Sequence, residues 1–222
     1  MIKYLLVVLL LSMTTLPAAS DSSSWQWSFG PYGGKAYVGT SPLASNNKDL
    51  LDVAMTAQPY INIATYHQEG DDGWTGPTGF YQQDMCSPLE MIPGTSKTWR
   101  LYYWNNADSP SSWLNTDLTW HYGLGVGESP PENIEYTLTF VRLPVGMTEW
   151  NPPPGSLALG ETITLNQEGN RVFWTYRTAN GLDGYVFDLT ATAIPEPSSL
   201  LVLGMGGCGM LGMAIRRRRS SR

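Results

Sequence analysis

The stretch "NIEYTLTFVRL" alternates apolar and polar side chains with a period of two residues. In an extended chain this period places Ile134, Tyr136, Leu138 and Phe140 on one face of a half-buried strand. The segments "ETITLN", "RVFWTYRT" and "GYVFDLTATA" follow with similar alternation. The separators "QEGN" and "ANGLDG" contain the Gly, Asn and Asp that tight turns require. The pattern predicts a succession of short strands joined by turns.

Shorter candidate strands precede this region, at residues 25–29, 35–38, 60–66, 98–104 and 117–122. The segment "NKDLLDVAMTA" is compatible with a helix, and a strand over residues 51–56 competes with it. Many short strands, frequent Gly and Pro breaks and no strand–helix alternation favour an all-β fold. We expect a single antiparallel β-sandwich of jelly-roll-like type over residues 21–193.

Residues 1–20 have the composition of a secretory signal peptide. A lone Lys3 precedes an apolar run, and the small residues Ala18 and Ser20 occupy the positions that signal peptidase reads. The run is too short to span a bilayer. We expect export and cleavage after Ser20.

The other end of the chain, residues 194–222, has a different composition. Leu200 to Ile215 form an uncharged run that would be about 24 Å long as a helix, close to the bilayer hydrocarbon thickness of about 30 Å. The cluster Arg216, Arg217, Arg218 and Arg219 follows it, and basic flanks of this kind stay cytoplasmic. The pattern predicts a transmembrane helix that leaves the bulk of the chain outside.

The order Pro195, Glu196, Pro197, apolar run, arginine cluster and chain end resembles a PEP-CTERM sorting signal. The resemblance covers about the last thirty residues and extends no further upstream. It implies that an exosortase-like membrane enzyme cuts the tail near Pro-Glu-Pro, in Gram-negative bacteria that usually make extracellular polysaccharide. The precursor would be anchored in the inner membrane, and the mature form would reach the cell envelope, outer surface or a biofilm matrix.

Without the two terminal signals the chain is strongly acidic. Seven basic and 18 acidic residues remain, a net charge of about −11, which repels phosphate backbones and argues against a nucleic-acid partner. Cys86 is the one cysteine left, since Cys208 lies in the tail. We expect Cys86 to pack as a buried apolar residue. The alternatives are an intermolecular disulfide and, after it, a reactive nucleophile.

The loop "YHQEGDDGWTGPTGFYQQD" brings Glu69, Asp71 and Asp72 together among glycines. Carboxylate oxygens on an irregular loop are ligands that Ca²⁺ favours, although the EF-hand order is missing. A solvated acidic turn is the preferred alternative. The same carboxylates, with Asp84 or Glu90, provide the residue types of a glycoside hydrolase, whose two carboxyl groups must face each other across a sugar cleft.

The mature region is rich in tryptophan, and the strand "TWRLYYW" carries large rings on both faces. One face is expected in the core, and the other exposes rings unless a second layer covers it. The candidate sugar-stacking and amide groups are Trp104, Trp113, Trp120, Asn105 and Asn106. Ordinary core packing is the competing interpretation.

Catalytic signatures such as Gly-x-Ser-x-Gly, His-Glu-x-x-His and the Walker loop are missing. We therefore expect a non-enzymatic, exported envelope or matrix protein that contacts exopolysaccharide. A secreted glycoside-active enzyme and a calcium-stabilised structural or adhesive module are the alternatives.

Overall fold

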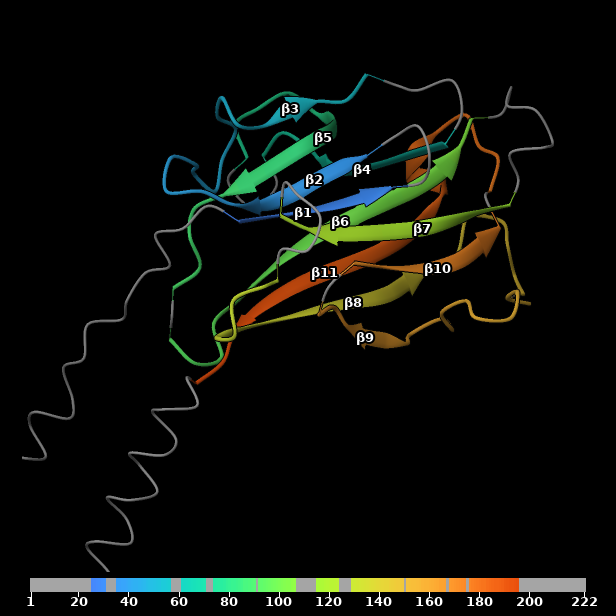
Figure 1. Cartoon of the computed structure of the whole chain (residues 1–222). Coiled ribbons are helices and arrows are strands. Elements are labelled where there is room, and N and C mark those ends of the chain that lie inside the picture. The colour runs from blue at the N-terminus through green and yellow to red at the C-terminus, as the bar shows by residue number, and fades with distance from the viewer. Residues whose placement is uncertain are drawn as a thin grey trace, which may run out of the picture.

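The computed structural model describes residues 25–30, 35–56, 61–70, 74–90, 92–106, 115–123, 129–149, 151–166, 168–174 and 176–195. These residues form strands and one short 3₁₀ turn, η3 (Gly181–Asp183). The strands, labelled in Figure 1, are β1 (Trp25–Gly30), β2 (Ala36–Thr40), β3 (Val53–Ala54), β4 (Ile61–His67), β5 (Gly79–Cys86), β6 (Ser96–Asn105), β7 (Asn115–Tyr122), β8 (Ile134–Arg142), β9 (Thr162–Thr164), β10 (Gly169–Trp174) and β11 (Tyr185–Ala193).

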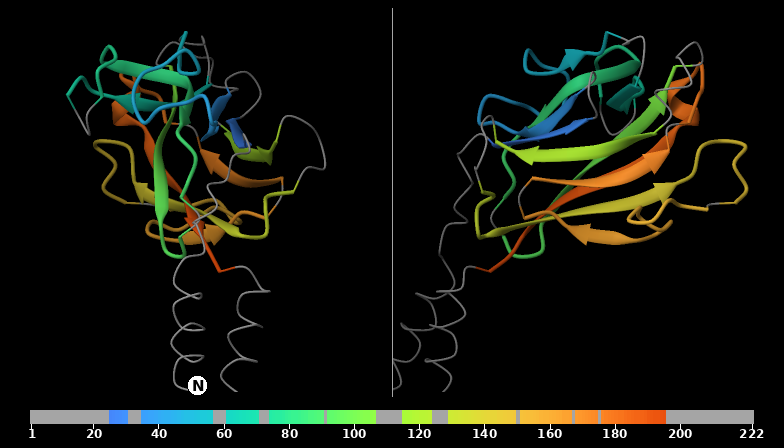
Figure 2. Two further views of the ribbon diagram at one scale, coloured as in Figure 1. Left: turned by 90° about the vertical axis from the view of Figure 1, so that its left-hand side faces the viewer. Right: turned by 45° about the vertical axis from the view of Figure 1, so that its right-hand side comes forward.

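The strands hydrogen-bond into one sheet with the order β10-β7-β1-β2-β5-β4-β6-β11-β8-β9, and β3 pairs with β5 at the side. The sheet is strongly curled, as the two views in Figure 2 show. Strands β9 and β10 lie at opposite ends of this order, yet only residues 165–168 separate them in the chain. The curl therefore brings the two halves of the sheet face to face.

The core fills the space between these halves. Trp27 on β1 packs edge-on against Tyr136 on β8, with ring centroids 5.4 Å apart. Phe173 on β10 makes the same kind of contact with Phe140 on β8 at 5.5 Å. These rings belong to one continuous cluster of buried residues, so burial of the apolar face of each alternating strand stabilises the curl.

The predicted all-β fold is confirmed. The expectation of a single antiparallel, jelly-roll-like β-sandwich is corrected in one respect, because β2 and β5 pair in parallel. All strands belong to one curled sheet. The segment 47–57 contains the short strand β3, which favours the strand interpretation over the helix. Strand β5 was not predicted, since Phe80 and Tyr81 lie next to each other and obscure the alternation.

Among the residues that the structure describes, no helix is long and apolar enough to span a membrane. The expected transmembrane helix and Arg216 to Arg219 lie outside the described residues, as does the expected signal peptide.

Candidate functional site

A cleft of about 660 Å³ lies where the ends of β4 and β5 approach β6 and β11. Rings, charged groups and hydrogen-bonding groups line it together. Its lining includes Tyr66, His67, Trp74, Asp84, Cys86, Thr98, Arg100, Tyr102, Arg142 and Asp188. Apolar rings beside a few convergent polar groups are the usual composition of a binding site for a small organic ligand or sugar.

Aromatic rings form one part of the cleft, on the side of the sheet that faces away from the core. Tyr66 on β4 and Tyr102 on β6 both line the cleft and are half-buried, with ring centroids 6.1 Å apart in an edge-on arrangement. Phe80 on β5 packs behind them, 5.1 Å from Tyr66 and 6.0 Å from Tyr102. Mutual packing fixes the orientation of both tyrosine rings without covering them completely.

Arg100 and Asp188 form a cross-strand ion pair beside these rings. The two residues are direct partners in the register of β6 and β11. The Arg100 Nε and NH2 groups donate to the two carboxylate oxygens at 2.9 and 3.0 Å, a bidentate geometry that raises the pKa of the guanidinium. The guanidinium of Arg142 is held nearby, since it donates to the Leu182 carbonyl.

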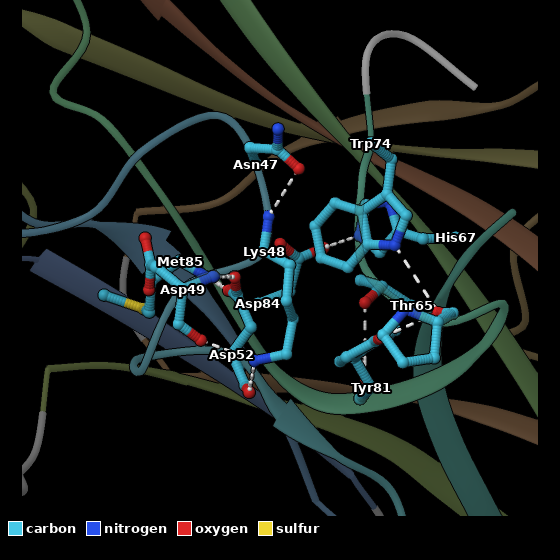
Figure 3. Close-up of polar contacts among 11 residues, drawn as sticks. Asn47, Lys48, Asp49, Asp52, Thr65, His67, Trp74, Tyr81, Asp84 and Met85 are labelled. Atoms are coloured by element: carbon cyan, nitrogen blue, oxygen red, sulfur yellow. Dashed lines mark hydrogen bonds and ion pairs between the residues drawn. The ribbon is translucent and has the colours of Figure 1, made fainter. Parts of the chain in front are cut away.

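His67 and Asp84 form another part of the cleft. His67 Nε2 lies 2.8 Å from Asp84 Oδ2, and the Asp84 side chain is 5% exposed whereas that of His67 is 28% exposed. The imidazole also stacks on the Trp74 indole, with centroids 3.9 Å apart and planes within 10° (Figure 3). The carboxylate and the indole together hold the imidazole in one orientation at the cleft.

The loop between β2 and β3 lies beside this part of the cleft (Figure 3). Asp52 accepts hydrogen bonds from the backbone amides of Met85 and Asp49, each at 2.9 Å. The Lys48 ammonium donates to the Asp52 carbonyl and lies 5.8 Å from the centre of the Tyr81 ring. Burial raises the pKa of the Asp52 carboxyl group. These contacts tie β5 to the loop.

Cys86 lines the same cleft but has the character of a buried thiol. Desolvation by burial, with a further contribution from the Asp84 charge, raises its pKa to about 12. A thiol with this pKa is almost entirely protonated near neutral pH and is a poor nucleophile. Cys86 is half-buried and packs against the core cluster, which favours the expectation of an apolar packing residue.

The predicted sugar-stacking residues lie elsewhere. Trp104 and Trp120 are each only 4% exposed and Asn105 is fully buried, whereas Asn106 is half-buried. None of the four lines the cleft, and Trp113 lies outside the described residues. A second layer covers Trp104, contrary to its expected role as a stacking ring: the Phe80 ring centroid lies 4.9 Å from that of Trp104, and η3 packs against it. Whether these residues contact sugar stays a prediction.

The predicted calcium loop is described only in part. Glu69 is exposed, and its backbone amide donates to the Thr78 hydroxyl at 2.9 Å. Asp71 and Asp72 lie outside the described residues. Within the described part of the chain, no three His, Cys, Asp or Glu side chains gather into a group able to hold a metal ion.

Both histidines lie beside a carboxylate: His67 beside Asp84, and His121 beside Glu168 at 3.0 Å. The cleft residues Arg100 and Asp188 were not predicted as site residues. They are 88 positions apart, and only the strand register brings them together. The nearest sequence signal was the two-faced strand 98–104, which contains Arg100 and Tyr102.

The end of the sheet coincides with the start of the C-terminal signal. The Ala193 amide donates to the Thr95 carbonyl and the Ile194 amide to the Asn133 carbonyl, each at 2.9 Å. Residues 193–219 match the model of the PEP-CTERM protein-sorting motif. The tail is a PEP-CTERM sorting motif. Pro195 is its last described residue and is exposed, whereas Glu196 and Pro197 lie beyond the described part.

The PEP-CTERM motif implies an exported protein that is sorted by an exosortase from a membrane-anchored precursor. It covers only the end of the chain. No curated protein and no solved structure shows significant similarity to this chain. For the region upstream of residue 193, the cleft is the feature that bears on function.

Proposed function

We propose that this is a non-enzymatic protein of the cell envelope, outer surface or extracellular matrix that binds polysaccharide in the cleft. The observation that carries the proposal is the half-buried pair Tyr66 and Tyr102 beside the ion pair of Arg100 and Asp188. Sugar rings stack their C–H faces on aromatic rings, and their hydroxyl groups bond to charged and amide groups of fixed orientation. Delivery through an exosortase-sorted tail places such a binder outside the cell.

A glycoside-active enzyme is the competing proposal, because Asp84 and Asp188 both line the cleft. Glycoside hydrolysis requires one carboxyl group as acid and one as nucleophile or base. Here Asp188 is bound bidentately by Arg100, and Asp84 is buried and bound to His67. Both carboxylates are committed to protein partners, which favours binding over hydrolysis.

Affinity electrophoresis of the exported protein in gels containing polysaccharide tests the proposal. We expect retardation by at least one polymer, and Tyr102→Ala should weaken it by about tenfold through loss of a stacking surface. Tyr37→Ala is the matched control, because Tyr37 is a half-buried strand tyrosine that does not line the cleft.

Equal retardation of both variants would overturn the placement of the site in the cleft. A parallel measurement of new reducing ends distinguishes the enzyme. Release of reducing ends by the wild type, abolished in Asp84→Asn or Asp188→Asn, would replace the binding function by hydrolysis.

A further inference from the structure

The outward faces of β6, β11, β8 and β9 carry threonines in register, which we call the threonine face. One row runs across four strands, since Thr98 pairs with Thr190, Thr190 with Thr137 and Thr137 with Thr164. The next row runs parallel to it and consists of Arg100, Asp188, Thr139 and Thr162. All six threonines are exposed or half-buried.

Four of the six threonine hydroxyl groups of this face are held in pairs. Thr98 Oγ1 lies 2.9 Å from Thr190 Oγ1, and Thr139 Oγ1 lies 2.8 Å from Thr162 Oγ1. The χ1 angle of a β-branched residue is also restricted. The face therefore presents hydroxyl and methyl groups in fixed positions, at the strand spacing of about 4.8 Å.

The threonine face is electrically neutral on a strongly acidic protein. The first row carries no charge, and the charges of the second row, on Arg100 and Asp188, cancel in their ion pair. The region between the two terminal signals has a net charge of about −11, which repels acidic polymers. The face fits a neutral polymer rich in hydroxyl groups, which loses no charge hydration on binding.

The threonine face is continuous with the cleft. Thr98, Arg100 and Asp188 line the cleft and also begin the two rows. From β6 to β9 each row crosses three strand spacings, about 14 Å at the usual separation. The combined surface therefore continues beyond the cleft across β11, β8 and β9.

We propose that the threonine face extends the cleft into one surface for an extended, neutral polysaccharide chain, which lies across β6, β11, β8 and β9. This proposal rests on the proposed function and adds the ligand class: a neutral chain of many sugar units, rather than an acidic polymer or a chain end. The cleft rings hold one segment of the chain, and the threonine hydroxyls bond to the hydroxyls of the next.

The test compares short and long neutral ligands on the exported protein. Binding of the short chains maltotriose and cellotriose is measured by calorimetry beside binding of starch and hydroxyethylcellulose, with alginate as the acidic polymer. The test variant is Thr190→Val with Thr137→Val, because it removes two hydroxyls of the face that do not line the cleft. Thr148→Val, an exposed threonine outside the face, is the control.

At about 0.5–1.5 kcal/mol per hydrogen bond, we expect the double variant to bind the favoured neutral polymer about tenfold more weakly than the wild type. Its affinity for the trisaccharide should be unchanged. Equal loss for both lengths, no loss for either, or tighter binding of alginate would overturn the threonine face while leaving the cleft in place.

Two further outcomes remain distinct. If the wild type binds no polymer and no trisaccharide, the proposed function fails together with this inference. If sedimentation shows a wild-type dimer that the double variant converts to monomers, the face is an interface between two copies of this chain, and the polysaccharide proposal for it is overturned.

Discussion

Replacement of Trp104 by alanine probes the side of β6 that faces away from the main core. The ring is 4% exposed and packs 4.9 Å from Phe80. The glycines of η3 and its C-cap allow this cover: a Cβ at Gly181 would lie 2.8 Å from the Trp104 ring, and one at Gly184 would lie 2.5 Å from the Tyr103 carbonyl oxygen. Trp104→Ala therefore leaves a large cavity under η3.

Truncation of a buried Trp or Phe to alanine costs about 3–5 kcal/mol. Only a thin layer covers Trp104, so the surrounding structure can partly fill the cavity. We therefore expect Trp104→Ala to lower the free energy of unfolding by about 3 kcal/mol. For a fold of this size about 2–4 °C are lost per kcal/mol, which predicts a melting temperature lower by about 6–12 °C. The denaturation midpoint should fall with an unchanged m-value.

Tyr102→Ala is the control for Trp104→Ala, because the neighbouring Tyr102 ring is half-buried and its removal leaves a smaller cavity. The reasoning is refuted if Trp104→Ala lowers the free energy of unfolding by less than about 1 kcal/mol, or by less than Tyr102→Ala does.

Three further predictions follow from the tail, the thiol and the acidic loop. Mass spectrometry of the surface form should find a chain without Arg216 to Arg219, and recovery of Arg222 would contradict sorting. Cys86 should react with a disulfide reagent at pH 8 only after unfolding. Burial raises the pKa of the Cys86 thiol from its ordinary value of 9.0 to about 12 in the folded protein. The contribution of the protonated thiol to folding stability is therefore complete below about pH 9 and is lost as the pH rises through the folded pKa. Millimolar calcium should raise the melting temperature of the wild type but not that of Asp71→Asn with Asp72→Asn, and an unchanged wild-type melting curve would indicate a solvated turn.

Much of the fold follows from local patterns, because the side-chain period of a strand needs no knowledge of its partners. The segments predicted at 25–29, 35–38, 60–66, 98–104 and 117–122 all lie within or overlap observed strands. Strand β5 was not predicted, because its buried residues Tyr81, Asp84 and Met85 do not follow a period of two.

The residues of the cleft could not be predicted from the sequence, because those that meet there are far apart in the chain. Asp84 and His67 are 17 positions apart, and Arg100 and Asp188 are 88 apart. Their meeting depends on strand register, and a shift of one residue would turn every side chain to the other face. Trp104 and Trp120 were candidate sugar-stacking rings because of their size, yet Trp120 belongs to the core cluster and Trp104 is covered by Phe80 and η3.

The sequence by itself determined the class of fold and the sorting motif at the end of the chain. Alternating polarity is a property of neighbouring residues, and a sorting motif is read as a linear order of segments, so neither requires a partner distant in the chain. The tertiary structure alone decided which rings are covered, which charges are paired and that the threonines of four strands form neutral rows. These depend on hydrogen-bonded register and on the curl of the sheet, which arise when strands far apart in sequence bury their apolar faces against one another.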